Sequence, residues 1–146
     1  MRHFPLGMHK DAEPAARAMQ AAHRQKKGHE MADKIFANMR ALTPEDLAKY
    51  AGEIGIDVGK FKVDLDSKEV KEEVEKDAQA GKDAGVRGTP SIFVNGKRFQ
   101  GQRTLEGFKP LVEEEIKAAD ELIKSGTPLD KVYETRAKLH AAAPPK

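Results

Sequence analysis

The sequence contains no cysteine among its 146 residues. Thiol–disulfide chemistry needs a nucleophilic thiolate at a helix N-terminus and a second thiol one turn away. By itself this chain therefore cannot carry out thiol redox chemistry, form a disulfide or bind a metal through sulfur. It also contains no glycine-rich phosphate loop and no Ser-His-Asp pattern. We accordingly assign no catalytic residue and expect no cofactor.

Histidine and carboxylate side chains are the other candidates for chemistry. His23, His29 and Glu30 are close in sequence, but their spacing and the intervening Gly28 do not place them on one helix face. We therefore expect no metal site. The other histidines are interpreted as surface residues: His3, His9 and His140.

Two carboxylate-rich runs, Glu69–Glu75 and Glu113–Glu115, are mixed with lysines at helical spacing, and they are interpreted as solvated helix faces. The net charge is +2, from 26 basic and 24 acidic residues that are interleaved along the chain. A nucleic-acid-binding protein would need a segregated basic stripe, so we expect no nucleic-acid partner. No apolar run approaches the length of a membrane span, and Met1–Gly7 is too short for a signal-peptide core.

The clearest strand is Ser91–Val94, whose consecutive apolar residues are typical of a strand covered on both faces. Asn95 and Gly96 supply the two positive-φ residues of a type I′ turn, and Lys97–Gln100 returns as a second strand. We therefore predict a β-hairpin over residues 91–100.

Thr89-Pro90 comes directly before this strand, where a proline cannot donate to the ladder, and we expect the bond to be cis. The run Val86–Gly96, which contains Gly88-Thr89-Pro90, resembles the cis-proline loop and hairpin of thioredoxin-fold proteins. More narrowly, it resembles the DsbA-like thiol–disulfide oxidoreductases of bacteria.

The resemblance implies an α/β fold, an incomplete thioredoxin-like (DsbA-like) domain over residues 1–140. It implies a helical insertion over about residues 11–85, followed by the cis-proline loop, the hairpin, C-terminal helices over residues 104–140 and a tail over residues 141–146. Met1–Leu6 is expected to be the end of the family's second strand. The family's first strand and its Cys-x-x-Cys helix would then lie before Met1 and be missing from this chain.

Capping residues and apolar spacing predict the helices of the insertion. Thr43-Pro44 is a strong helix start and Gly55 ends that helix, whereas Asp66 or Ser67 begins a longer helix that ends at Gly85. The methionine and aromatic side chains at helical spacing are interpreted as core residues: Met19, Met31, Phe36, Met39 and Tyr50.

The C-terminal part is predicted to contain two helices. Thr104 could cap the first, but Pro110 lies too late for a first turn, so we expect a kink or a regular helix only from about Lys109. An apolar stripe follows, and Thr127-Pro128 begins the last helix. The stripe consists of Val112, Ile116, Ala119 and Ile123.

In a thioredoxin sheet the family's first strand lies between the Arg2–Leu6 strand and the Ser91–Val94 strand. Its absence would expose two sheet edges, which natural proteins seldom leave bare. Four explanations stay open. The neighbouring strands close up, a second copy supplies the edge, a separate chain supplies the missing piece, or the sequence is a piece of a longer gene product.

Two functions are compatible with these observations. The chain is either a redox-inactive, truncated or degenerate relative of the DsbA-like oxidoreductases, inactive as an enzyme by itself, or a non-catalytic module for protein interaction or self-association. The resemblance implies a binding loop of Arg87, Gly88, Thr89 and Pro90, which offers backbone groups to a protein, a peptide or a second copy in a homo-oligomer. Family members are often periplasmic or in the cell envelope, whereas no feature of this sequence indicates a compartment.

Overall fold

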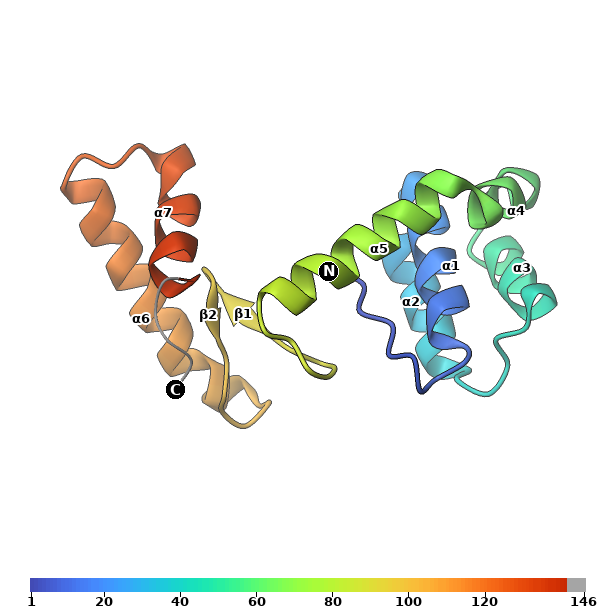
Figure 1. Cartoon of the computed structure of the whole chain (residues 1–146), viewed down its shortest axis with the longest axis horizontal. Coiled ribbons are helices and arrows are strands. Elements are labelled where there is room, and N and C mark those ends of the chain that lie inside the picture. The colour runs from blue at the N-terminus through green and yellow to red at the C-terminus, as the bar shows by residue number, and fades with distance from the viewer. Residues whose placement is uncertain (142–146) are drawn as a thin grey trace. The chain divides into compact units, whose positions relative to one another are not determined.

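The structure is a computed structural model that describes residues 1–141. The described residues form seven helices and one two-stranded antiparallel sheet (Figure 1). They divide into two compact units, the first over Met1–Gly88 and the second beginning at Thr89. The chain is thus mostly helical, and its small sheet belongs to the second unit.

The first unit is built around helix α1 (Ala12–Arg24), which contacts each of the unit's other helices. Its buried face is made of alanines, and Ala18, Ala21 and Ala22 are fully buried, so neighbouring helices can approach closely. Larger side chains from the neighbours, among them Phe61, fill the space around it. These neighbours are α2 (Gly28–Ala37), α3 (Pro44–Glu53), α4 (Val58–Asp66) and α5 (Lys68–Asp83).

The helix starts predicted at Thr43 and at Ser67 are confirmed. Thr43 and Asp46 form a capping box, in which the Thr43 hydroxyl accepts a hydrogen bond from the Asp46 amide. Ser67 accepts from the amide of Val70 in the same way at the start of α5. Each cap satisfies an amide that the first helical turn leaves without a partner.

The prediction of a strand in Met1–Leu6 is wrong, because this segment pairs with no strand in the described part of the chain. The segment instead forms hydrogen bonds with side chains of α1 and α5. The His3 amide donates to Asp77 at 2.9 Å, and Arg2 pairs with the same carboxylate at 2.7 Å. The interpretation of His3 as a surface residue is also wrong: its ring is half-buried, contacts Gln20 at 3.3 Å and has a pKa lowered by burial.

The assignment of core residues is correct only in part. Met31 and Tyr50 are buried, and the Tyr50 hydroxyl donates to the Ala41 carbonyl at 2.9 Å. Phe36 and Met39 are instead 62% and 68% exposed, because they lie where α2 ends and its apolar face loses its neighbours. Their helical spacing indicated a common face but not the point at which the packing stops.

The second unit contains the hairpin, formed by β1 (Phe93–Val94) and β2 (Lys97–Arg98). Phe93 lies opposite Arg98 and Val94 opposite Lys97, and Asn95 and Gly96 both have positive φ, as the predicted turn requires. The strands are shorter than predicted, and the Ser91–Val94 segment is half-buried rather than covered on both faces.

Helices α6 (Leu105–Lys124) and α7 (Leu129–Ala141) pack against each other, and each also contacts one strand of the hairpin. Thr104 caps α6, as predicted, by accepting from the Gly107 amide at 3.1 Å. The predicted delay at Pro110 is wrong, because α6 runs from Leu105 through Pro110 as one helix. The cap fixes the first turn, so the helix tolerates the one hydrogen bond that the proline cannot donate.

Candidate functional site

The four binding residues predicted from the sequence lie on the irregular segment between α5 and β1. Arg87, Thr89 and Pro90 are exposed and Gly88 is half-buried. The boundary between the two units falls within this group, after Gly88. The Thr89–Pro90 peptide bond is cis.

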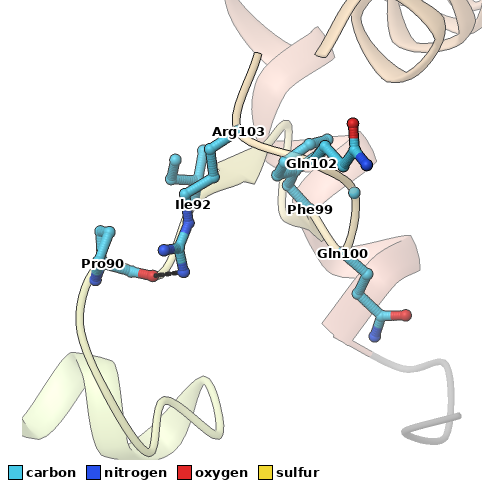
Figure 2. A pocket seen from close by; sticks show the side chains of 7 residues that line it. Pro90, Ile92, Phe99, Gln100, Gln102 and Arg103 are labelled. Carbon is cyan, nitrogen blue, oxygen red and sulfur yellow. Dashed lines mark hydrogen bonds between the residues drawn. The ribbon is translucent and has the colours of Figure 1, made fainter. Parts of the chain in front are cut away.

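A pocket of about 450 Å³ lies beside Pro90 in the second unit (Figure 2). Of the four predicted residues, Pro90 is among the lining residues that the structure describes, whereas Arg87, Gly88 and Thr89 are not. The pocket therefore lies at the open end of the hairpin and is formed mainly by the residues that follow β2. Its lining residues are Pro90, Ile92, Phe99, Gln100, Gly101, Gln102 and Arg103.

The apolar part of the pocket is formed by Ile92 and Phe99, which the hairpin holds together. The Phe99 amide donates to the Ile92 carbonyl at 2.8 Å, just beyond the last paired residues of the strands. The Phe99 ring stacks on Phe108 of α6, with ring centroids 4.0 Å apart. A Cβ atom at Gly101 would lie 2.9 Å from the Phe99 ring, so glycine there allows the chain to pass close to the aromatic side chain.

The polar part of the pocket consists of Gln100, Gln102 and Arg103, all of which are exposed. In Figure 2 the Arg103 side chain reaches toward Pro90, and its Nη2 donates to the Pro90 carbonyl at 3.1 Å. The described lining residues include one arginine and no carboxylate. The site therefore offers amides, a guanidinium and a backbone carbonyl next to an apolar surface.

A second polar cluster lies between α6 and α7, outside the pocket. Arg136 donates to both carboxylate oxygens of Glu115, at 3.0 Å and 2.8 Å, and His140 contacts the same carboxylate at 3.0 Å. The hydrogen bond from Arg136 lowers the pKa of Glu115; burial acts in the opposite direction, and the contact with His140 lowers the pKa further.

The sequence-based interpretation of these residues as solvated is wrong. Glu115 is only 1% exposed, and His140 is half-buried against it. Their role in the structure is to connect the two helices, because the cluster lies between α6 and α7.

Other features of the described chain suggest no reaction chemistry. No group of three or more His, Asp or Glu side chains within residues 1–141 could hold a metal ion. Glu30, considered above as a ligand, pairs with Lys27 at 2.7 Å. None of the helices in the described part of the chain is long and apolar enough to span a membrane. A second hollow, of about 340 Å³, lies at the end of α2 and is lined by residues 36–41.

Sequence reasoning missed most of the pocket. Phe99 and Gln100 were predicted only as residues of the second strand, and Gln102 and Arg103 were given no role, because none of the four belongs to the proline motif. A usable signal was present: an aromatic residue followed by polar residues and a glycine directly after a hairpin strand. The contact between Arg103 and Pro90 could not be predicted from the sequence, because 13 residues separate them.

Comparisons with known proteins agree with the resemblance. A family model for the DsbA-like thioredoxin domain matches residues 1–113. Similar curated proteins include the Na⁺/H⁺ antiporter NhaA of Herminiimonas arsenicoxydans, which is 41% identical over 101 residues, covering 69% of this chain and 16% of the antiporter. The Na⁺/H⁺ antiporter NhaA 3 of Salinispora tropica is 35% identical over 112 residues, covering 76% of this chain and 17% of that protein.

The Na⁺/H⁺ antiporter NhaA 1 of Mycobacterium sp. (strain KMS) is 39% identical over 103 residues, which cover 68% of this chain and 17% of the antiporter. This chain thus spans about a sixth of the length of the curated relatives it matches. No solved structure matches it. Since the family model covers most of the sequence, the chain belongs to the DsbA-like thioredoxin domain family.

Proposed function

We propose that this chain is a redox-inactive DsbA-like domain that binds an extended polypeptide segment in the pocket beside Pro90. The observation that carries the proposal is the pocket itself, in which an apolar surface lies next to a backbone carbonyl and two side-chain amides. Such a combination suits a peptide, whose main chain needs hydrogen-bond partners and whose side chains need apolar cover. The absence of cysteine removes the family's thiol chemistry but not this binding capacity.

The binding segment extends, in this proposal, from the pocket to Thr89 and Pro90, the two residues of the predicted loop that belong to the second unit. Arg87, Gly88 and Thr89 precede Pro90 on a segment without regular secondary structure. Strand addition requires only backbone donors and acceptors along such a segment. The proposal therefore assigns the peptide main chain to Thr89 and Pro90 and its side chains to Ile92 and Phe99.

The test is a binding titration followed by fluorescence anisotropy. The probe is a labelled, cysteine-free peptide of about ten residues, a length sufficient for an extended segment. We expect saturable binding to the wild-type chain and strongly reduced binding to Ile92→Asn, which places an amide in the apolar part of the pocket. Ile116→Asn is the matched control, because Ile116 is 55% exposed on α6 and does not line the pocket.

Two results would overturn the proposal. One is a wild-type chain that does not bind the peptide in its folded state, as judged by circular dichroism. The other is an equal loss of binding in Ile92→Asn and Ile116→Asn, which would place the binding surface elsewhere.

A second candidate function, self-association, is favoured by apolar exposure in the same unit. Val112, Ile116 and Ile123 of α6 are 38%, 55% and 42% exposed, and β1 pairs only with β2 among the described strands. A second copy could cover both the helix face and the strand edge with a symmetric contact. Light scattering at tens of micromolar tests this candidate. A dimer that Ile116→Glu converts to a monomer supports it, and a compact wild-type monomer contradicts it.

The names of the relatives suggest where such binding would be used. Because the similar proteins are named as Na⁺/H⁺ antiporters, we propose that the bound polypeptide is an extramembrane segment of such a transporter. Co-purification of a tagged antiporter with the wild-type chain, but not with Ile92→Asn, is the expected result. Equal recovery of both forms would contradict this assignment of the partner.

A further inference from the structure

Arg103 is an exposed cation whose only hydrogen bond within the described chain is to a neutral acceptor. Its Nη2 donates to the Pro90 carbonyl at 3.1 Å (Figure 2), and Arg103 forms no ion pair with any residue in the range 1–141. A guanidinium has five N–H donors in a planar fork that matches the geometry of a carboxylate. Most of the donor capacity of Arg103 is therefore unused by its contact with Pro90.

Two other arginines of the described chain show what this side chain does when a carboxylate is within reach. Arg136 binds Glu115 through two nitrogens, and Arg24 binds Glu73 at 2.9 Å. In contrast, the described lining of the Pro90 pocket contains no acidic residue, so the charge of Arg103 is not neutralised there. An occupant that brings a carboxylate would complement the pocket electrostatically.

We propose that Arg103 makes the pocket selective for peptides that carry an aspartate or glutamate side chain, by exchanging its hydrogen bond to Pro90 for an ion pair with the peptide. This inference rests on the proposed function, because it specifies the peptide that the same pocket binds. The exchange is favourable because a carboxylate adds the attraction of an opposite charge and can accept two parallel N–H bonds from the guanidinium, whereas the Pro90 carbonyl accepts one from it. It also frees the Pro90 carbonyl to accept a main-chain N–H of the incoming peptide.

The two halves of this exchange depend on each other. While Arg103 donates to the Pro90 carbonyl, a neutral peptide that takes this carbonyl can offer the guanidinium only a neutral acceptor in return. An acidic peptide offers it a carboxylate, so the Pro90 carbonyl becomes available and the guanidinium gains an ion pair. The neighbouring Ile92 and Phe99 then cover an apolar side chain next to the acidic one.

The test uses two labelled, cysteine-free peptides that differ only by glutamate or glutamine at one position. Each is titrated against the wild-type chain, Arg103→Gln, Arg103→Lys and the control Lys117→Gln. The control removes the same charge from the same unit at an exposed position that does not line the pocket. Because the ion pair is solvent-accessible, we expect the wild-type chain to prefer the glutamate peptide by roughly fivefold.

In Arg103→Gln the preference should disappear, while the affinity for the glutamine peptide stays equal or rises because the Pro90 carbonyl is free. Arg103→Lys should retain part of the preference, and Lys117→Gln should retain all of it. The wild-type preference should also decrease with added salt. An unchanged preference in Arg103→Gln, or an equal loss in Lys117→Gln, would overturn the selectivity while leaving peptide binding intact. Failure of both peptides to bind the wild-type chain would instead overturn the proposed function as well.

Discussion

Glu115 of α6 and Arg136 of α7 form a two-point ion pair that connects the two C-terminal helices. Arg136 Nε donates to one carboxylate oxygen at 3.0 Å and Nη2 to the other at 2.8 Å. The Glu115 side chain is 1% exposed and that of Arg136 is 15% exposed. A buried carboxylate in a unit this small depends on its partner, since an unpaired charge there would be strongly unfavourable.

Replacing Arg136 by methionine should therefore destabilise the second unit. Removal of one partner from a buried ion pair typically costs about 3–5 kcal/mol. Lys138→Met is the matched control, because Lys138 lies on the same helix and its pair with Glu134 is exposed, and it should change stability by less than about 1 kcal/mol. Hydrogen exchange of the α6 and α7 amides measures the effect in this unit alone. Equal protection in the two variants would contradict the role assigned to Arg136.

The same pair predicts a pH dependence of stability. Because the pKa of Glu115 is lower in the folded chain than its ordinary value of 4.5, the unfolded state binds the proton more readily. The stabilisation is therefore fully present above that value and decreases as the pH falls through the lower, folded pKa. The urea midpoint of the wild-type chain should fall more steeply between about pH 5 and pH 3 than that of Glu115→Gln. Parallel pH profiles would contradict the prediction.

Gly96, in the turn of the hairpin, lies against Ala137 of α7, and it should not tolerate a side chain. Its φ is +86°, and a Cβ atom would lie 2.7 Å from the Ala137 Cα. Gly96→Ala should therefore cost more than about 1 kcal/mol in free energy of unfolding. Gly126→Ala is the control, because Gly126 has a similar φ of +97° but no atom near the added Cβ. If both variants lose the same stability in urea unfolding, the contact with α7 is not the cause.

The lack of cysteine predicts that the chain catalyses no disulfide exchange. Insulin reduction by dithiothreitol should proceed at the same rate with the chain as in buffer alone, because no thiolate nucleophile is present. A rate above that of the buffer would contradict the redox-inactive interpretation.

Features set by neighbouring residues could be predicted from the sequence. The caps at Thr43, Ser67 and Thr104 and the Asn95-Gly96 turn depend on residues within about one turn of the chain, so their signals are local. Pro110 shows the limit of this approach, because the cap and the packing of α6 outweigh the hydrogen bond that proline cannot make.

Features set by packing could not be predicted. The Glu115–Arg136 pair joins residues 21 positions apart, and its carboxylate lies in a run of glutamates that looks solvated. Phe36 and Met39 have the spacing of core residues, but the helix ends where they would need a neighbour. The Pro90 pocket was missed for a similar reason, since among its described lining residues only Pro90 and Ile92 belong to the Val86–Gly96 motif.

The central claim, that the pocket beside Pro90 binds an extended polypeptide without thiol chemistry, is tested most directly by nuclear magnetic resonance. A ¹⁵N-labelled chain is titrated with an unlabelled, cysteine-free acidic peptide, and the backbone amides are followed individually. The account predicts saturable shifts concentrated at Ile92 and over residues 99–103, which line the pocket, with little change at the hollow lined by residues 36–41. Unshifted amides around Pro90 at saturating peptide, or shifts confined to residues 36–41, would contradict it.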